Sequence, residues 1–271
     1  MTEAHDFPPA DDDLSLALSL ADAADAVTTA RYLALDLAVE TKPDSTPVTD
    51  ADRAVEQEVR RLLGRRRPGD SVVGEEFGES GAGARRWVVD PIDGTKNFVR
   101  GVPVWATLIA LMEADKVYVG VVSAPELGRR WWASRGQGAW LRAAGREPRR
   151  LHVSGVRDLA DASLSYASLQ GWEATPGGLD GLLELSRRVW RTRAYGDFWS
   201  YALVAEGAVD VVAEPEVSLW DLAALSVLVE EAGGRFTDLR GRPGPDGGSA
   251  AASNGLLHDD LLALLGGPVP R

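Results

Sequence analysis

The sequence predicts a layered α/β protein, and two observations support this fold class. The first half of the chain carries two amphipathic helical patterns, within residues 13–63, followed by short runs of β-type residues up to residue 142. The second half alternates helical and strand patterns to its end. Elements with one apolar face have to stack in layers to bury it, so we expect helices to cover the sheets.

The first 84 residues are expected to be mainly helical. Apolar residues recur at helical spacing from residue 13 to residue 40, which predicts one long helix that ends in a proline-containing loop. Thr49 then precedes an acidic turn and an apolar stripe, which predicts a second helix that stops at Gly64. A short strand at residues 72–73 and a mobile glycine-rich loop up to Ala84 follow.

The remaining elements are short and are separated by turn residues. In the first half, strands are expected at residues 87–90, 104–112, 117–122, 130–133 and 139–142, the last four antiparallel. In the second half, strands are expected at residues 164–166, 190–194, 209–213, 236 and 250–253, and helices at residues 179–189, 198–206 and 222–231 and at the end of the chain.

The composition is that of an ordinary globular protein, with 271 residues of which 45% are apolar and 26% charged. We expect a disordered acidic tail at residues 1–12 and a single domain at residues 13–268, with an N-terminal lobe (13–150) that binds metal and a C-terminal α/β lobe (151–268). The chain has no run of 18 apolar residues and no basic and apolar leader, so neither a membrane span nor a secretory signal is expected.

Charge and residue types exclude several functions. The net charge of -12 disfavours nucleic acid and anionic membranes as partners, because neither is attracted to an acidic surface. The absence of cysteine excludes disulfides, thiolate zinc sites and cysteine nucleophiles, and it fits a cytoplasmic protein. The histidines, His5, His152 and His258, are scattered, which disfavours a histidine zinc site or a Ser-His-Asp triad.

The most informative segment runs from Asp90 to Thr95 and reads Asp-Pro-Ile-Asp-Gly-Thr. It places two carboxylates on a turn at the carboxyl end of an apolar strand, which Pro91 and Gly94 are expected to end. A helix that begins near Thr95 would direct free N–H groups toward a phosphate. The segment therefore predicts hard metal ions beside a phosphate; the simpler alternative is that Asp90 and Asp93 only cap a turn.

Other acidic residues also stand at element boundaries: Asp50, Glu75, Glu76 and Asp221. Carboxylates that meet in one pocket repel one another and partly protonate unless cations neutralise them. All-oxygen ligands, with the backbone carbonyl of Ile92 as one of them, favour Mg²⁺ or Mn²⁺ over zinc.

These motifs resemble those of the inositol monophosphatase superfamily of magnesium-dependent phosphatases. The resemblance covers residues 14–265 and rests on four segments: Val48 to Asp50, Gly74 to Glu76, Asp90 to Phe98, and Trp220 to Ala224. It implies the αβαβα sandwich of inositol monophosphatase and fructose bisphosphatase, and a phosphomonoesterase activity. Members of the superfamily commonly form dimers, so a homodimer is expected.

The resemblance also implies two or three Mg²⁺ ions and a set of ligands for them. Glu75 and Asp90 are expected to hold the first ion, and Asp90, Asp93 and Asp221 the second, with the carbonyl of Ile92 as a further ligand. Asp90 is thus expected to bridge the ions.

In the reaction that the resemblance implies, a metal-activated water attacks the phosphate directly, without a covalent phosphoenzyme. The water is assigned to Thr95, which is expected to be hydrogen-bonded to Asp50, with Glu75 or Glu76 nearby. The phosphate oxygens are expected to rest on the N–H groups of Gly94 and Thr95.

Within the superfamily, the runs Asp90 to Trp105 and Arg193 to Phe198 resemble those of actinobacterial-type histidinol-phosphate phosphatases, enzymes of histidine biosynthesis. By resemblance, Glu214, seven residues before Asp221, is the acid that binds the substrate alcohol, and Asp221 is expected to be a substrate-binding residue as well. A second acid at Asp197 favours a substrate with an ammonium and an imidazole over the uncharged inositol.

Asn97 and Tyr195 are expected to add a hydrogen bond and a ring face for the imidazole. The alternative for Asp197 is that it only caps a helix that begins at Phe198.

Two alternatives to histidinol phosphate hydrolysis stay open at this point. One is a sibling phosphatase that acts on inositol phosphates, fructose bisphosphate or a 3'-phosphoadenosine nucleotide. The other is a regulatory or structural protein that binds metal on the same fold without turnover.

Overall fold

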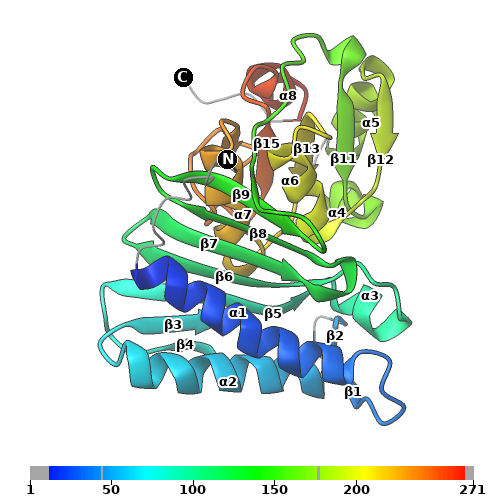
Figure 1. Ribbon diagram of the computed structural model, residues 1–271. Helices are drawn as coiled ribbons and strands as arrows, with labels where there is room; N and C mark the ends of the chain where they lie inside the picture. Colours follow the sequence, from blue (N-terminus) through cyan, green and yellow to red (C-terminus); the bar gives the residue numbers. More distant parts are fainter. Residues whose placement is uncertain (1–11, 44, 176–177, 266–271) are drawn as a thin grey trace.

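A computed structural model describes residues 12–43, 45–175 and 178–265. The helices and sheets stack in five layers, helix, sheet, helix, sheet and helix, as the sequence predicts (Figure 1). Residues 1–11 of the predicted tail and residues 266–268 of the predicted domain lie outside the described residues. The division into lobes after residue 150 stays a prediction.

Helices form three of the layers. Helices α1 (Asp12–Arg31) and α2 (Asp50–Arg66) cover the outer face of the first sheet, α6 (Asp197–Ala205) and α7 (Leu219–Glu231) lie between the two large sheets, and α4 (Leu169–Ala174), α5 (Gly178–Arg188) and α8 (His258–Leu265) cover the outer face of the second sheet. Short helices also connect the layers: α3 (Thr95–Arg100), η1 (Pro125–Leu127) and η2 (Leu159–Asp161). None of the helices within the described residues has the length and apolar character that crossing a membrane requires.

The strands of the described residues form two large sheets and one hairpin. The first sheet has the order β10 (Arg149–Arg150), β9 (Gly138–Ala143), β8 (Arg129–Ser134), β7 (Lys116–Ala124), β6 (Ala106–Glu113), β5 (Arg85–Asp93), β3 (Ser71–Gly74) and β4 (Gly78–Ser80). The second has the order β12 (Arg191–Arg193), β11 (Ser163–Tyr166), β13 (Val211–Glu214), β15 (Ala250–Ser253) and β14 (Arg235–Thr237), and the hairpin joins β1 (Val39–Thr41) to β2 (Pro47–Thr49). The predicted antiparallel run is confirmed from β6 to β9, whereas β3 is parallel to β5.

A β-bulge in β5 places its two aspartates on the same face of the first sheet. Along β5, Val88 packs with α7 and Val89 packs with α1 and α2, so Asp90 points toward α7 by alternation. Asp93, three residues on, would point the opposite way in a regular strand. However, Asp90 pairs with Leu108 and Asp93 with Ala106, so β5 has one residue more than β6 at this point. This extra residue returns Asp93 to the α7 side.

Two predicted ends were wrong for reasons of backbone geometry. The strand does not end at Asp90: β5 continues through Pro91 to Asp93, because a bulge does not require every ladder N–H and therefore tolerates proline. The first helix ends at Arg31 and not at residue 40, since Leu33 adopts a left-handed backbone with φ 60°. The apolar residues beyond Arg31 continue the helical spacing in the sequence without forming helix. Leu35, one of them, is fully exposed and so packs against no core.

Other segments also differ from the prediction. Helix α2 passes through the exposed Gly64 and ends at Arg66, because one glycine weakens a helix without stopping it. The predicted loops contain short paired strands, β1 with β2 and β4 with β3. Periodicity cannot reveal strands of three residues.

Helix α7 is buried on all sides between the two large sheets. Eight consecutive residues, Leu222 to Val229, are buried, which is typical of a central helix. Its close approach to the first sheet depends on Gly120 of β7. A Cβ atom at Gly120 would lie 2.6 Å from the carbonyl oxygen of Ala224 and 2.6 Å from Cγ1 of Val227.

We expect Gly120→Ala to destabilise the protein by about 1–3 kcal/mol, because a rigid backbone carbonyl cannot move away from the added methyl group. Gly64→Ala is the matched control: nothing lies within 4 Å of a Cβ atom there. It should stabilise α2 by up to about 1 kcal/mol, because alanine favours helix. Denaturant unfolding of both variants measures the two changes, and a Gly120→Ala variant as stable as the wild type would contradict this account of the packing.

Candidate active site

A cavity of about 440 Å³ opens where the first sheet, α6, α7 and the second sheet meet. The end of β5 and the start of α3 form one side, and the start of α6, the end of β13 and the start of α7 form the other. Acidic side chains dominate its lining, namely Glu75, Asp90, Asp93, Asp197, Glu214, Glu216 and Asp221. Among the described residues that line it, Lys96 is the one basic residue. An anionic substrate therefore cannot bind here without added positive charge.

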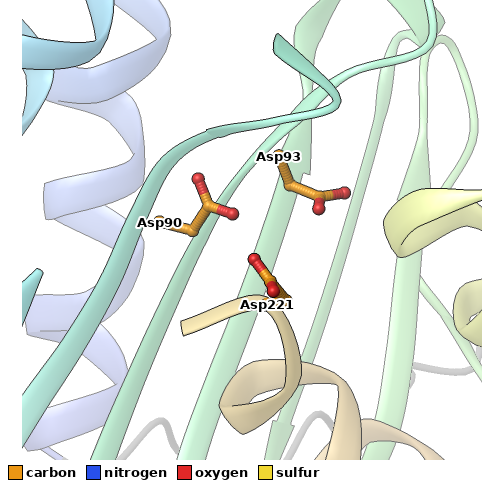
Figure 2. Close-up of side chains that lie close together, drawn as sticks. All are labelled: Asp90, Asp93 and Asp221. Carbon is orange, nitrogen blue, oxygen red and sulfur yellow. The ribbon is translucent and has the colours of Figure 1, made fainter. Parts of the chain in front are cut away.

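Three of these carboxylates converge (Figure 2). Asp90 and Asp93 project from the end of β5, and Asp221 projects toward them from the first turn of α7. Carboxylate oxygens of all three lie within 4.8 Å of one another. Asp90 is 2% exposed and Asp93 8%, so water screens the charges poorly.

Each of the three carboxylates is held by a backbone N–H group. Ile92 N donates to Oδ1 of Asp90 (3.0 Å), Phe198 N to Oδ2 of Asp93 (2.6 Å), and Ser218 N to Oδ2 of Asp221 (2.7 Å). Within the described residues, no arginine or lysine forms an ion pair with any of them.

Burial and repulsion raise the pKa values of the three carboxyl groups. Burial is the main cause of the raised pKa of Asp90, followed by the charges of Glu75, Asp93 and Asp221. The pKa of Asp93 is raised by burial and then by Asp197 and Asp221. The pKa of Asp221 rises to about 6, again mainly through burial. The cluster thus favours either protons or bound cations at neutral pH.

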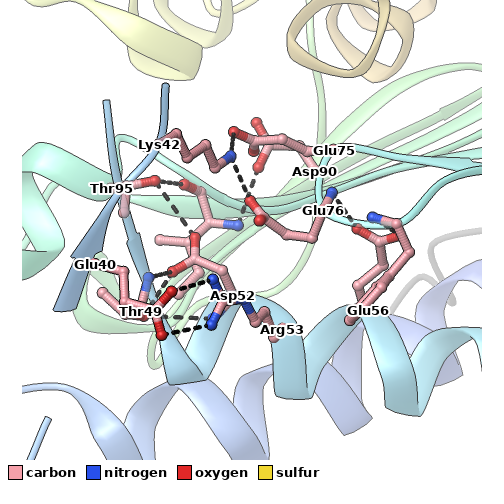
Figure 3. Close-up of polar contacts among 12 residues, drawn as sticks. Glu40, Lys42, Thr49, Asp52, Arg53, Glu56, Glu75, Glu76, Asp90 and Thr95 are labelled. Atoms are coloured by element: carbon pink, nitrogen blue, oxygen red, sulfur yellow. Dashed lines mark hydrogen bonds and ion pairs between the residues drawn. The ribbon is translucent and has the colours of Figure 1, made fainter. Parts of the chain in front are cut away.

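Glu75 and Glu76 lie beside this cluster, in the turn that follows β3 (Figure 3). The Nζ atom of Lys42 lies 2.7 Å from Oε1 of Glu75 and 2.6 Å from Oε1 of Glu76. The buried Glu56 of α2 fixes the turn by accepting hydrogen bonds from the N–H groups of Glu76 (2.7 Å) and Phe77 (3.2 Å). Glu75 lines the cavity with Asp90, whereas Glu76 is not among the lining residues.

The hydroxyl of Thr95 faces Asp52 and not Asp50 (Figure 3). Its Oγ1 atom lies 3.4 Å from Oδ1 of Asp52 and 2.9 Å from the carbonyl oxygen of Ile92. Asp50 instead forms an ion pair with Arg31, with Oδ2 of Asp50 2.7 Å from Nη2 of Arg31. The predicted hydrogen bond between Thr95 and Asp50 is therefore wrong.

The start of α2 explains this correction. Thr49 is the N-cap, so Asp50 is the first helical residue and Asp52 the third. The third residue of a capping box folds back over the cap, and Oδ2 of Asp52 accepts from Thr49 N (2.8 Å) and Thr49 Oγ1 (2.5 Å). Burial raises the pKa of Asp52 to about 6. The Thr-x-x-Asp spacing was the signal in the sequence that identifies Asp52.

Gly94 makes the transition from β5 to α3 in a left-handed conformation (φ 83°). A Cβ atom there would lie 3.1 Å from the carbonyl oxygen of Val104 and 3.3 Å from Oδ2 of Asp197. The helix begins at Thr95, as predicted, and its hydrogen bonds begin with the N–H of Asn97, which donates to the carbonyl oxygen of Gly94 (2.8 Å), so the N–H groups of Thr95 and Lys96 precede them. Their contact with phosphate stays a prediction.

Asp197, on the α6 side of the cavity, meets Asn97 of α3. Nδ2 of Asn97 donates to the carbonyl oxygen of Val104 (2.8 Å) and lies 3.4 Å from Oδ2 of Asp197. Asp197 is the first residue of α6, with φ 46°, and the N-cap is Gly196. The helix already includes Asp197, so the predicted alternative that Asp197 caps a helix beginning at Phe198 is wrong.

Glu214 lines the cavity on the same side as Asp197, whereas Tyr195 does not line the cavity. Glu214 is 6% exposed, and the hydroxyl of Tyr201 donates to its Oε2 at 2.5 Å. Tyr195 is absent from the lining of the cavity; its ring packs on Trp199 and its hydroxyl accepts from Arg191 (3.2 Å). The expected contact of the Tyr195 ring with a substrate stays a prediction.

The donor set fits hard divalent cations. Converging carboxylate oxygens, with the carbonyl of Ile92 nearby, are the ligands that Mg²⁺ and Mn²⁺ prefer. The described residues contain no cysteine or histidine in this lining, which disfavours zinc.

Residues 11–266 match the model of the inositol monophosphatase family. The chain belongs to this family. It is 64% identical over 258 residues to a histidinol-phosphatase of Streptomyces coelicolor, a match that covers 94% of this chain and 97% of the relative. It is also 64% identical over 255 residues to a histidinol-phosphatase of Mycobacterium tuberculosis, covering 94% and 98%.

Solved structures of inositol monophosphatase family members share the fold. The extragenic suppressor protein suhB of Bartonella henselae superposes with a TM-score of 0.84 at 30% identity, covering 94% of this chain and 98% of that one. An IMPase of Thermotoga maritima gives 0.82 at 30% identity, covering 94% and 96%. The predicted membership of the family, its sandwich fold and its enzymatic nature are confirmed.

Besides Asp52, sequence reasoning missed Tyr201 as a residue that lines this cavity. A tyrosine inside an apolar helical pattern reads as core, and nothing in the sequence shows that its hydroxyl meets Glu214. The contact of Lys42 with Glu75 and Glu76 depends on the β1–β2 hairpin, which was not predicted.

We expect Mg²⁺ to stabilise the protein more at about pH 7.5 than at about pH 5. The pKa values of Asp90, Asp93 and Asp221 are raised by folding. The stability that such groups add is present below their unfolded pKa and is lost as the pH rises through the folded value, about 6 for Asp221. The metal-free protein should therefore weaken as the pH rises, while Mg²⁺ offsets the repulsion.

Thermal unfolding with and without Mg²⁺ measures this effect. Mg²⁺ at about 100 times its Kd adds ~2.7 kcal/mol, which raises Tm by roughly 5–10 °C in a chain of this size. Asp93→Asn should lose most of the shift, and Asp180→Asn, a change at an exposed residue of α5, should keep it. A shift that does not depend on pH or on Asp93 would contradict the account.

Proposed function

We propose that the protein is a Mg²⁺-dependent phosphomonoesterase that hydrolyses L-histidinol phosphate to L-histidinol and phosphate in histidine biosynthesis. The convergence of Asp90, Asp93 and Asp221 carries the reaction type, because a largely buried cluster of carboxylates without basic partners needs divalent cations. The two relatives at 64% identity that bear the name histidinol-phosphatase support the substrate. We further propose a cytoplasmic homodimer.

Five residues would hold the metal. They are Glu75, Asp90, Asp93, Asp221 and Ile92, the last through its backbone carbonyl, and together they would hold two or three ions. When bound, divalent ions supply charge for the phosphate and lower the pKa of a water molecule. Mn²⁺ is the alternative metal, since it accepts the same oxygen donors.

Thr95 and Asp52 would orient and deprotonate the attacking water. The Thr95 hydroxyl donates to an acceptor within reach, the carbonyl of Ile92 or Asp52, and so leaves its lone pairs free to accept from a water. Asp52 has one oxygen held by Thr49, while its Oδ1 faces Thr95. A pKa near 6 suits a general base at neutral pH. Glu75 and Glu76 would adjust the charge nearby, and Lys42 partly neutralises both.

The two ends of the substrate would contact different residues of the cavity. The phosphate would lie by the N–H groups of Gly94 and Thr95. The ammonium or imidazolium of histidinol would face Asp197 and Glu214, because a cation offsets the repulsion between these acids.

Asn97 would orient Asp197, since its side-chain N–H lies within hydrogen-bond distance of that carboxylate. Inositol has no charge to offer these acids. Charge therefore favours histidinol phosphate over inositol 1-phosphate at these acids.

We expect the purified protein with Mg²⁺ to hydrolyse histidinol phosphate with a kcat/KM at least about 100-fold above that for inositol 1-phosphate, since the buried Glu214 and the partly buried Asp197 both favour a cationic substrate. A panel of these two esters, fructose 1,6-bisphosphate and 3'-phosphoadenosine 5'-phosphate tests this, with phosphate release as the readout. Faster turnover of another ester would replace the proposed substrate. No turnover of any ester would instead support the metal-binding regulatory alternative.

A second prediction separates Asp52 from Asp50. Asp52→Asn should lower kcat at least about 100-fold, because the amide cannot accept the proton of the attacking water. Asp50→Asn changes the neighbouring first helical residue in the same way and should lower kcat less than about threefold, because Asp50 pairs with Arg31. Equal losses in the two variants would refute a general-base role that is specific to Asp52.

A further inference from the structure

The hydroxyl of Tyr201 meets a substrate-facing carboxylate inside the core. Tyr201 of α6 is 1% exposed, and its ring packs on Phe236 of the second sheet with ring centroids 5.9 Å apart. Its hydroxyl donates to Oε2 of Glu214 at 2.5 Å, and this hydrogen bond joins α6 to the last residue of β13. Both residues line the cavity.

This hydrogen bond leaves Glu214 one oxygen for a ligand. Within the described residues, the structure shows no hydrogen bond or ion pair to Oε1 of Glu214. This oxygen is also not one of the fully buried polar atoms without a partner, so it stays accessible from the cavity. The Tyr201 ring is fixed by packing in the core, so its hydrogen bond to Oε2 limits rotation of the Glu214 carboxylate. The oxygen Oε1 is thereby presented in one position.

Glu214 needs this support because its surroundings oppose its charge. Burial, with Asp197 and Asp221 nearby, raises the pKa of Glu214 to about 8, and the Tyr201 hydroxyl acts in the opposite direction. A hydrogen bond from a neutral donor stabilises the carboxylate without neutralising it. Lysine or arginine in place of Tyr201 would cancel the charge that a cationic ligand requires.

We propose that Tyr201 is a positioning residue for substrate recognition, which holds Glu214 as an oriented carboxylate for the cationic part of the substrate. The inference rests on the proposed function. It assigns Tyr201 no contact with the phosphate, so its effect should fall on binding of the cationic substrate more than on kcat.

Tyr201→Phe tests the proposal, because it removes one oxygen atom and keeps the packed ring. We expect KM for histidinol phosphate to rise about tenfold, the effect of losing a hydrogen bond to a charged group, with kcat changed less than about threefold. The ratio of kcat/KM for histidinol phosphate to that for glycerol 2-phosphate should fall by a similar factor. Tyr118→Phe, at a half-exposed tyrosine of β7 outside this cavity, is the matched control.

A double-mutant cycle with Glu214→Gln tests whether Tyr201 acts through Glu214. In the Glu214→Gln background, Tyr201→Phe should change KM less than about twofold, because no charge is left to orient. Independent, additive effects would overturn the proposal. So would a Tyr201→Phe variant that unfolds at lower temperature but binds histidinol phosphate as well as the wild type, since that result defines a structural role.

The failure of this inference is distinct from failure of the proposed function. If the wild type hydrolyses histidinol phosphate and Tyr201→Phe leaves KM unchanged, only the role of Tyr201 falls. If the wild type prefers an uncharged ester, both fall together. Should Tyr201→Phe fail to fold, Glu214→Gln still tests the inference. An unchanged KM for histidinol phosphate in that variant would show that the Glu214 carboxylate does not bind the substrate, so Tyr201 would have no carboxylate to orient.

Discussion

Repulsion between buried carboxylates is the constraint on which the rest of the site depends. Asp90, Asp93 and Asp221 are each fixed by a backbone N–H group instead of a basic side chain. A backbone donor sets the position of a carboxylate but leaves its charge largely uncompensated. The fold thereby keeps a strong local demand for cations, and the stiffness of the packed layers prevents the carboxylates from moving apart to relieve it.

Local motifs that start helices also aim the functional acids. Asp52 and Asp221 each occupy the third position of a capping box, after Thr49 and Ser218 respectively. In both motifs one carboxylate oxygen satisfies the N-cap N–H, so the other is presented at a fixed angle to the site. Helix stability and carboxylate orientation thus come from the same hydrogen bond. The bulge in β5 plays the equivalent part for Asp93, because it reverses the alternation that would turn this residue away.

The sequence was sufficient for the layers and for the identity of the acidic cluster, and insufficient where geometry depends on distant contacts. Period-2 and helical patterns found β6 to β9 and α7 because these elements are long and have buried faces. The choice between Asp50 and Asp52 required knowledge of which residue is the N-cap, which the Thr-x-x-Asp spacing indicated. By contrast, no local signal shows that Tyr201 reaches Glu214 or that Tyr195 turns toward Trp199.

The two acidic groups in the cavity differ in how their charge is balanced, and this difference argues for a substrate with unlike ends. Around Asp90 the negative charge is concentrated, and only divalent ions offset it compactly. Around Glu214 and Asp197 the donors are the neutral hydroxyl of Tyr201 and the neutral amide of Asn97. They orient two carboxylates and leave a smaller deficit, which a monovalent ammonium or imidazolium matches. Divalent ions that also bind a phosphate at the first group, and an organic cation at the second, would therefore balance the charge of the cavity together, and histidinol phosphate has one end for each.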